Sequence, residues 1–186
     1  MRHAIIFLTW MALLAVAGAG EFKTAAIFSD QMVLQRDKAV PIWGWADPGE
    51  EITIKFGGQT KTTKADAAGK WLVRLDPMPA SAVARAIEIR GGSDARRATI
   101  EGVLVGEVWL GSGQSNMAMT VGRARDFEVE KAAADLPQIR MFKEASGAAK
   151  APQMDGSGAW SVCSAETVGD FSATLYFFGR EIHRAL

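Results

Sequence analysis

Alternation of apolar and polar side chains dominates the sequence from Ala25 to Glu101 and strongly constrains how this segment can fold. Apolar residues recur at every second position in residues 52–56, 71–75 and 87–89. A period of two with one apolar face is typical of half-buried antiparallel strands. The stretches are separated by turn-forming clusters at Asp47-Pro48-Gly49, Gly57-Gly58, Ala68-Gly69 and Gly91-Gly92-Ser93. Residues 21–101 are therefore predicted to form an antiparallel β-sandwich. The side chains expected to face its interior are Ile52, Ile54, Phe56, Trp71 and Val73.

The pattern changes after Gly102, where helix-forming stretches appear between short apolar runs. Residues 103–110 are mostly apolar, as expected of a strand buried on both faces of a parallel sheet. A helix is expected around residues 127–135, a strand at 138–142, a surface loop at 143–158 and a second helix at 172–186. The second helix carries one apolar stripe, made of Leu175, Phe178, Ile182 and Leu186.

This order of strands and helices predicts an α/β domain over residues 102–186. A doubly wound sheet needs more strands than these residues supply, so the domain is expected to be incomplete. The predicted fold class is therefore a two-part α+β chain. Its N-terminal antiparallel β-sandwich precedes the first part of a three-layer α/β domain.

Residues 1–20 have the order of regions typical of a secretory signal peptide. Arg2 provides a positive charge, residues 4–16 are apolar except for Thr9, and small residues 17–20 form a cleavage site. A membrane anchor is the alternative, but this apolar run is shorter than the roughly 20 residues that span a bilayer. The mature chain is therefore expected to be secreted or periplasmic, without a stable membrane anchor.

The overall composition excludes several classes of function. Lys plus Arg and Asp plus Glu each number 21, which gives a net charge of zero. This balance lacks the basic surface of a nucleic-acid-binding protein, so no nucleic-acid partner is expected. A single cysteine, Cys163, allows neither an intrachain disulfide nor a thiolate metal cluster.

Ser115 is the strongest candidate for a reactive residue. It lies in the glycine-bearing turn at residues 111–116, between the predicted strand and a predicted helix. Such a turn projects a hydroxyl beyond the carboxyl end of a sheet, where α/β folds bind ligands. The free N–H groups at a helix start suit a developing oxyanion. The nucleophile-elbow motif G-x-S-x-G is not met, because Met117 occupies the place of its second glycine. Ser112 is a competing nucleophile, and a turn without a catalytic role is the structural alternative.

Other candidate sites are weaker. The Gly111-x-Gly113 pattern lacks the Lys-Ser/Thr of a phosphate-binding loop. His183 is the only histidine after the predicted signal peptide, and a solvated helix position is expected for it. Cys163 is expected to be a buried, unreactive thiol rather than a catalytic partner of His183. Trp43 and Trp45 alternate on a predicted strand, where aromatic residues fill a core more often than they stack on sugars.

The motifs resemble those of the sialate O-acetylesterase family. The resemblance begins with Phe28-Ser29-Asp30-Gln31-Met32-Val33-Leu34-Gln35-Arg36 and Val40-Pro41-Ile42-Trp43-Gly44-Trp45-Ala46. It is strongest in Val105-Gly106-Glu107-Val108-Trp109-Leu110-Gly111-Ser112-Gly113-Gln114-Ser115-Asn116-Met117. It continues with Phe171-Ser172-Ala173 and Tyr176-Phe177-Phe178-Gly179-Arg180-Glu181, so it covers nearly the whole predicted mature chain.

The resemblance implies a carbohydrate esterase of the SGNH hydrolase type that removes O-acetyl groups from sialic acid or related acetylated sugars. The family's nucleophile falls on Ser115, whose backbone N–H contributes to the oxyanion hole. Catalysis then proceeds by two-step acyl transfer without a metal or organic cofactor. The family's further oxyanion donors, a Gly and an Asn, and its Asp-x-x-His block have no matching positions here.

The chain by itself is therefore expected to lack efficient esterase activity, because a serine needs a positioned base to lose its proton. His183 is not assigned that role, since it is expected at the flank of its helix. A secreted, non-catalytic β-sandwich module that binds carbohydrate, or an inactive esterase fragment, is the alternative function.

Overall fold

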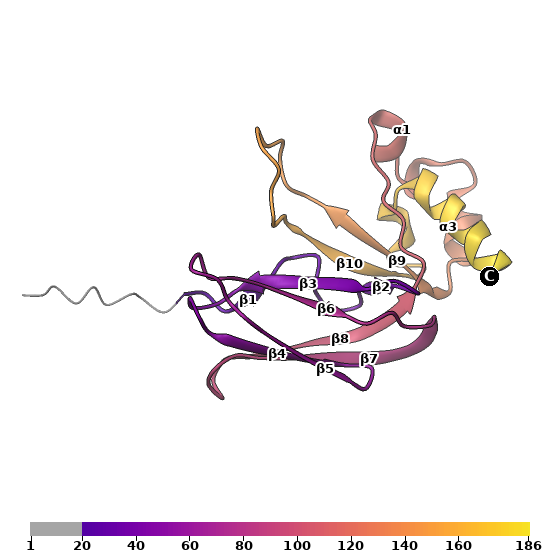
Figure 1. Cartoon of the computed structure of the whole chain (residues 1–186). Helices are drawn as coiled ribbons and strands as arrows, with labels where there is room; N and C mark the ends of the chain where they lie inside the picture. Colours follow the sequence, from indigo (N-terminus) through magenta and orange to yellow (C-terminus); the bar gives the residue numbers. More distant parts are fainter. Residues whose placement is uncertain (1–19) are drawn as a thin grey trace, which may run out of the picture.

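A computed structural model describes residues 20–186 (Figure 1). The predicted signal peptide, up to Ala19, lies outside these residues. The described part of the chain consists of two stacked β-sheets followed by a smaller part that combines helices with a β-hairpin. No helix within residues 20–186 combines the length and apolar character needed to cross a bilayer.

The eight strands of the N-terminal part form two sheets. One sheet has the order β1-β3-β6 and comprises β1 (Lys23–Thr24), β3 (Val40–Trp45) and β6 (Lys70–Leu75). The other has the order β2-β8-β7-β4-β5. It comprises β2 (Val33–Gln35), β4 (Glu51–Phe56), β5 (Gln59–Lys64), β7 (Ser81–Arg90) and β8 (Arg97–Gly106). All strand pairs are antiparallel except β2 with β8, which is parallel.

A single hydrophobic core joins the inner faces of these two sheets. The side chains of Ile52 and Ile54 are completely buried, and those of Phe56, Trp71 and Val73 are each 3% exposed. The alternation in sequence follows directly from the strand geometry, because successive side chains point to opposite faces of a sheet. The prediction that these five side chains face inward is confirmed.

The second part of the chain contains the remaining elements. Its helical segments are α1 (Ser115–Ala118), η1 (Val121–Arg123), α2 (Phe127–Ala132), η2 (Val168–Asp170) and α3 (Ala173–Ala185). Its strands β9 (Leu136–Glu144) and β10 (Gly158–Cys163) pair as an antiparallel hairpin. A second hydrophobic core gathers Val121, Cys163, Val168, Phe171 and Tyr176. An ion pair of 2.5 Å between Arg180 and Glu130 ties α3 to α2.

The predicted buried strand at residues 103–110 is wrong in its second half. Strand β8 ends at Gly106, and the side chains of Trp109 and Leu110 are 57% and 95% exposed. A buried parallel strand needs a hydrogen-bonded neighbour and a packed layer on each face. Within the described residues, no strand pairs with residues 107–114. An apolar composition alone therefore did not bury this segment.

The predicted parallel sheet is also wrong for the described residues. The strand expected at residues 138–142 is present as part of β9, but its neighbour is the unpredicted β10, and the two run antiparallel. The connection between them, residues 145–157, is an irregular loop. A parallel pair requires a crossover, commonly through a helix, whereas a loop can join an antiparallel pair.

Helix α3 lies where a helix was predicted, but it buries a different face from the expected one. Ala173 and Tyr176 are buried against the second core, while Phe178 and Leu186 of the predicted stripe are 41% and 81% exposed. The helix carries apolar residues on both faces. The position of its neighbours, rather than its apolar periodicity, determines which face is covered.

Candidate active site

The glycine-bearing turn at residues 111–119 places Ser115 at the first position of α1. Ser115 is exposed to solvent. The N–H groups at a helix start lack partners inside the helix, so the Ser115 amide is available to a ligand. Because α1 is only four residues long, its dipole adds little to the hydrogen bonds that the free amides can donate.

The segment that leads to this turn runs antiparallel to α3. The rings of Trp109 and Phe178 meet edge to face with centroids 5.1 Å apart. Two residues further on, Gly111 lies so close to Leu175 that a Cβ at position 111 would come within 2.5 Å of the leucine side chain. Any side chain at position 111 would therefore displace the Leu175 side chain. Residues 109–111 are thus packed along α3 rather than paired with a strand.

A groove with a volume of ≈ 1320 Å³ is lined by residues of α3, the turn before α1, the β9–β10 hairpin and the neighbouring strands β2 and β8. In Figure 1 the hairpin and the α1–α3 region lie on the same side of the two sheets. The aromatic residues that line the groove include Trp109 before α1, Phe178 of α3, Trp160 of β10 and Trp43 of β3. Ser112, Gln114 and Met117 line the groove as well, but Ser115 does not. The Ser115 hydroxyl is therefore exposed beside the groove rather than inside it.

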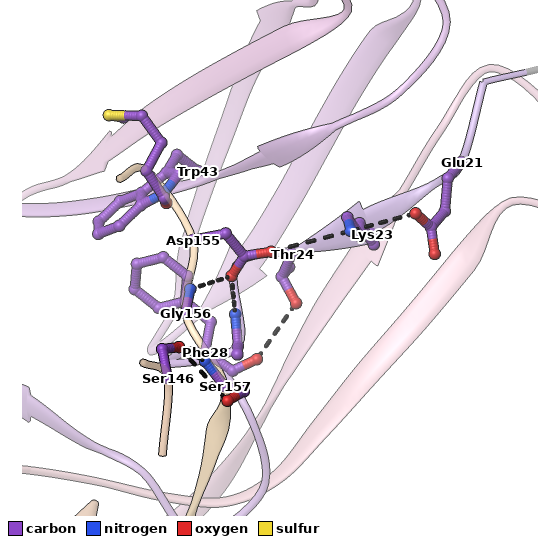
Figure 2. A network of polar contacts seen from close by, with 11 residues as sticks. Glu21, Lys23, Thr24, Phe28, Trp43, Ser146, Asp155, Gly156 and Ser157 are labelled. Carbon is purple, nitrogen blue, oxygen red and sulfur yellow. Dashed lines mark hydrogen bonds and ion pairs between the residues drawn. The ribbon is translucent and has the colours of Figure 1, made fainter. Parts of the chain in front are cut away.

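Asp155 anchors the hairpin side of this groove to the N-terminal sheets, as Figure 2 shows. Its Oδ1 accepts hydrogen bonds from the amides of Ala26 and Gly156 at 2.8 and 2.9 Å. Its Oδ2 lies 3.8 Å from Nζ of Lys23 in β1. Beside it, Nε1 of Trp43 donates to the carbonyl oxygen of Met154 at 2.8 Å.

Two further side chains connect the hairpin to the N-terminal part of the chain. Nε1 of Trp160 donates to the carbonyl oxygen of Ile27 at 2.8 Å, and the Arg140 guanidinium donates to the carbonyl oxygens of Gln31 and Gly102. Partial burial lowers the pKa of Arg140, but an arginine stays charged at any physiological pH. One wall of the groove is therefore fixed to the sheets by indole and guanidinium groups.

The other residues considered from the sequence do not complete a catalytic constellation with Ser115. His183 is exposed and lines the groove from the far part of α3. Cys163 is buried in the second core, and burial raises the pKa of its thiol. The hydrogen bonds made by α1 within residues 20–186 use backbone groups and the Met117 thioether, and none uses the Ser115 hydroxyl.

Within the described part of the chain, no three His, Cys, Asp or Glu side chains lie close enough together to hold a metal ion. The Gly111-x-Gly113 pattern lies in the exposed turn.

Trp43 packs against the first core, and its ring meets Phe28 edge to face at 4.5 Å. Trp45 packs there too, with Lys23 Nζ over its ring at 5.3 Å. Both indoles pack against the first core, and Trp43 also lines the groove.

No family model matches the chain. It is, however, similar to the sialate O-acetylesterases of Homo sapiens and Mus musculus, each 30% identical over 91% of this chain. It is 32% identical to the sialate O-acetylesterase of Pongo abelii, also over 91% of the chain. The chain spans only about a third of the length of these relatives, between 34% and 36%.

Solved structures include a similar fold. A carbohydrate acetylesterase from Xanthomonas citri superposes with a TM-score of 0.83 and is 35% identical in sequence. The superposition covers 88% of this chain and 37% of that one. The resemblance to sialate O-acetylesterases that the motifs indicate is thereby confirmed, over a part of those proteins.

Proposed function

We propose that this chain supplies the serine nucleophile of a carbohydrate ester hydrolase. The substrates proposed are sialic acid or related sugars that carry O-acetyl groups. The observation that carries this proposal is the exposed Ser115, which begins α1 within the Gly-Gln-Ser-Asn-Met sequence. The similarity to carbohydrate acetylesterases supports the same class of substrate.

The chemistry proposed is acyl transfer in two steps. Oγ of Ser115 attacks the carbonyl carbon of the acetyl group, its proton passes to a general base, and the sugar hydroxyl leaves. The amide of Ser115 donates a hydrogen bond to the tetrahedral oxyanion. Water then attacks the acetyl-serine and releases acetate. The base is a group that does not contact Ser115 in this structure, since no hydrogen bond within residues 20–186 reaches its hydroxyl.

We assign the chain from residue 21 to the end of β8 at Gly106 to a β-sandwich domain and the residues after it, up to 186, to the first part of an SGNH-type α/β domain. The boundary predicted at residue 101 moves because β8 continues the second sheet and its Val103 and Val105 lie in the first core. The second assignment accounts for the exposed Val108, Trp109 and Leu110, which lead into the turn of Ser115 without a strand partner among the described residues. Export to the periplasm or the medium is proposed from the apolar residues 4–16.

The test is acetate release from O-acetylated sialic acid and from an aryl acetate by the product of the complete coding sequence. Replacement of a serine nucleophile lowers turnover by several orders of magnitude, so Ser115→Ala should be nearly inactive. Ser112→Ala is the matched control and should retain activity. Hydrolysis at only the background rate by both the unmodified protein and Ser115→Ala would contradict the proposal and favour a non-catalytic carbohydrate-binding module. An inactive Ser112→Ala beside an active Ser115→Ala would transfer the nucleophilic role to Ser112.

A further inference from the structure

The start of α3 hydrogen-bonds directly to the single helical turn that begins with Ser115. Oγ of Ser172 donates to the carbonyl oxygen of Met117 at 2.7 Å, and Oγ1 of Thr174 donates to the carbonyl oxygen of Asn116 at 3.1 Å. The acceptors are the two residues that follow Ser115 in the chain. The donors lie 55 and 58 residues further along it.

These two hydroxyl groups satisfy carbonyls that α1 itself cannot. The last four carbonyl groups of a helix have no partner inside it, and α1 contains four residues in total. Its own bonds are those from the amides of Ala118 and Met119 to the carbonyls of Gln114 and Ser115, both 3.0 Å long. Ser172 and Thr174 therefore complete the hydrogen bonding of this turn from outside.

Backbone hydrogen bonds also connect the residues just after α1 with the start of α3. Thr120 and Ser172 form an antiparallel bridge. The amide of Ala173 donates to the carbonyl oxygen of Met119 at 2.8 Å, and the amide of Val121 donates to that of Phe171 at 2.9 Å. The bridge fixes the exit of the turn, whereas the two hydroxyl groups hold its interior.

A one-turn helix is not stable alone, because the first hydrogen-bonded turn costs more conformational entropy than it recovers. The conformation at Ser115 therefore depends on the contacts that α1 makes with α3. We propose that Ser172 and Thr174 are positioning residues, which hold α1 in the conformation that presents the Ser115 hydroxyl and amide to the ester. This inference rests on the proposed nucleophilic role of Ser115.

The first experiment measures hydrogen exchange in this chain and does not depend on catalysis. Loss of one hydrogen bond weakens local structure enough to speed exchange several-fold. Ser172→Ala and Thr174→Val should each speed exchange at Ala118 and Met119 by roughly five- to tenfold. Tyr176, whose amide bonds the carbonyl of Ser172, should keep its rate, which shows that α3 stays folded. Thr62→Val, which removes a hydroxyl on β5 that contacts Thr53 on β4, is the matched control.

The second experiment measures ester hydrolysis by the product of the complete coding sequence with the same substitutions. A displacement of about 1 Å at a reacting group lowers the rate about a hundredfold. The double substitution Ser172→Ala/Thr174→Val should lower kcat tenfold to a hundredfold with little change in KM. Ser172→Thr keeps the donor hydroxyl and should restore kcat.

The outcomes separate the two proposals. Unchanged exchange at Ala118 and Met119 in Ser172→Ala and in the double variant would overturn the positioning role, as would full kcat in the double variant. If the double variant does not fold, the comparison of Ser172→Thr with Thr174→Val decides the question by the same two measurements. Faster exchange combined with full activity of Ser115→Ala would leave the contacts to α1 established but refute Ser115 as the nucleophile.

Discussion

The amide of Val108 donates a hydrogen bond of 2.9 Å to Oε1 of Gln35, which lies 73 residues earlier in the chain. Nε2 of the same glutamine donates to Oε2 of Glu107 at 3.2 Å. One side chain at the end of β2 thus holds the backbone and a carboxylate where the chain leaves β8. The exposed segment that leads to Ser115 begins from this attachment.

Replacing Gln35 should loosen residues 107–108 without unfolding the sheets. Gln35→Leu removes both hydrogen bonds at similar volume, and each contributes about 1 kcal/mol. We expect the Val108 amide to exchange severalfold faster. Gln59→Leu is the matched control, because Gln59 makes a similar pair of bonds with the backbone of Asp76. It should leave the exchange of Val108 unchanged, and equal effects of both substitutions would contradict a local role for Gln35.

Glu50 should contribute strongly to the stability of the sheets. Its side chain is 8% exposed, bonds Arg96 at 2.7 Å, and accepts the amide hydrogens of Gly92 and Asp47 at 2.9 and 3.0 Å. Arg96 is 19% exposed and keeps a second ion pair with Asp47 at 2.7 Å. The loss therefore comes mainly from the hydrogen-bond donors that Glu50 leaves unsatisfied, at about 1–3 kcal/mol, and urea denaturation of Glu50→Ala at neutral pH should show a loss of about 2–3 kcal/mol. Glu88→Ala, which breaks an exposed pair with Arg90, should cost no more than about 1 kcal/mol. Similar losses for the two variants would be evidence against the prediction.

Replacing Gly69, in the turn just before β6, should clearly destabilise the protein. Its φ is +75°, and a Cβ there would lie 2.5 Å from the carbonyl oxygen of Ala46. A left-handed conformation costs a residue with a Cβ about 1–2 kcal/mol, and the backbone contact adds to this cost. Gly69→Ala should therefore lower the free energy of unfolding by more than about 2 kcal/mol. Gly58→Ala is the control, since φ is +81° there but nothing lies within 4 Å. Gly58→Ala should lower the free energy of unfolding by about 1 kcal/mol. An equal loss at both glycines would show that the contact with Ala46 is unimportant.

Cys163 should react slowly with thiol reagents in the native protein. Its side chain is 1% exposed, and burial is the main reason that its thiol pKa is raised. A raised pKa reduces the thiolate fraction at pH 7–8, and the thiolate is the reactive form. Modification by a chromogenic disulfide should take place at the rate of unfolding and become immediate in denaturant. Immediate modification of the native protein would contradict the buried position.

Lowering the pH should loosen the loop between β9 and β10. Hydrogen bonds from Ser146, and a further one from the amide of Ser157, lower the pKa of the exposed Glu144. A carboxylate with a depressed pKa in the folded state stabilises it above the ordinary pKa of glutamate, and the stabilisation is lost as the pH falls through the depressed value. Amide exchange at Ser146 and Ser157, corrected for intrinsic rates, should therefore increase below about pH 4. Glu144→Gln should remove this dependence, and an unaltered pH profile in that variant would exclude Glu144 as its cause.

The two sheets could be predicted from sequence because strand periodicity is a local property. Ile52, Ile54 and Phe56 face the core for the same reason that they alternate with polar residues, since successive side chains of a strand point to opposite faces. The turns were equally local. Gly57 and Gly69 both have positive φ values, which glycine adopts readily. The position of Ser115 in a turn at the start of a helix could also be predicted from its motif, whereas the conformation of that turn depends on distant contacts with α3.

The sequence by itself determined the strands that face the first core and the place of the C-terminal helix, and it located the turn that carries Ser115. Only the tertiary structure decided that Trp109 and Leu110 stay exposed, that β9 pairs with β10, and that α3 buries Tyr176 instead of its regular apolar stripe. It alone brought Gln35, Ser172 and Thr174 to the segment around Ser115, across separations of 55 to 73 residues. The physical reason is that backbone periodicity acts over a few neighbouring residues, whereas burial and hydrogen bonding depend on which distant segment supplies the partner.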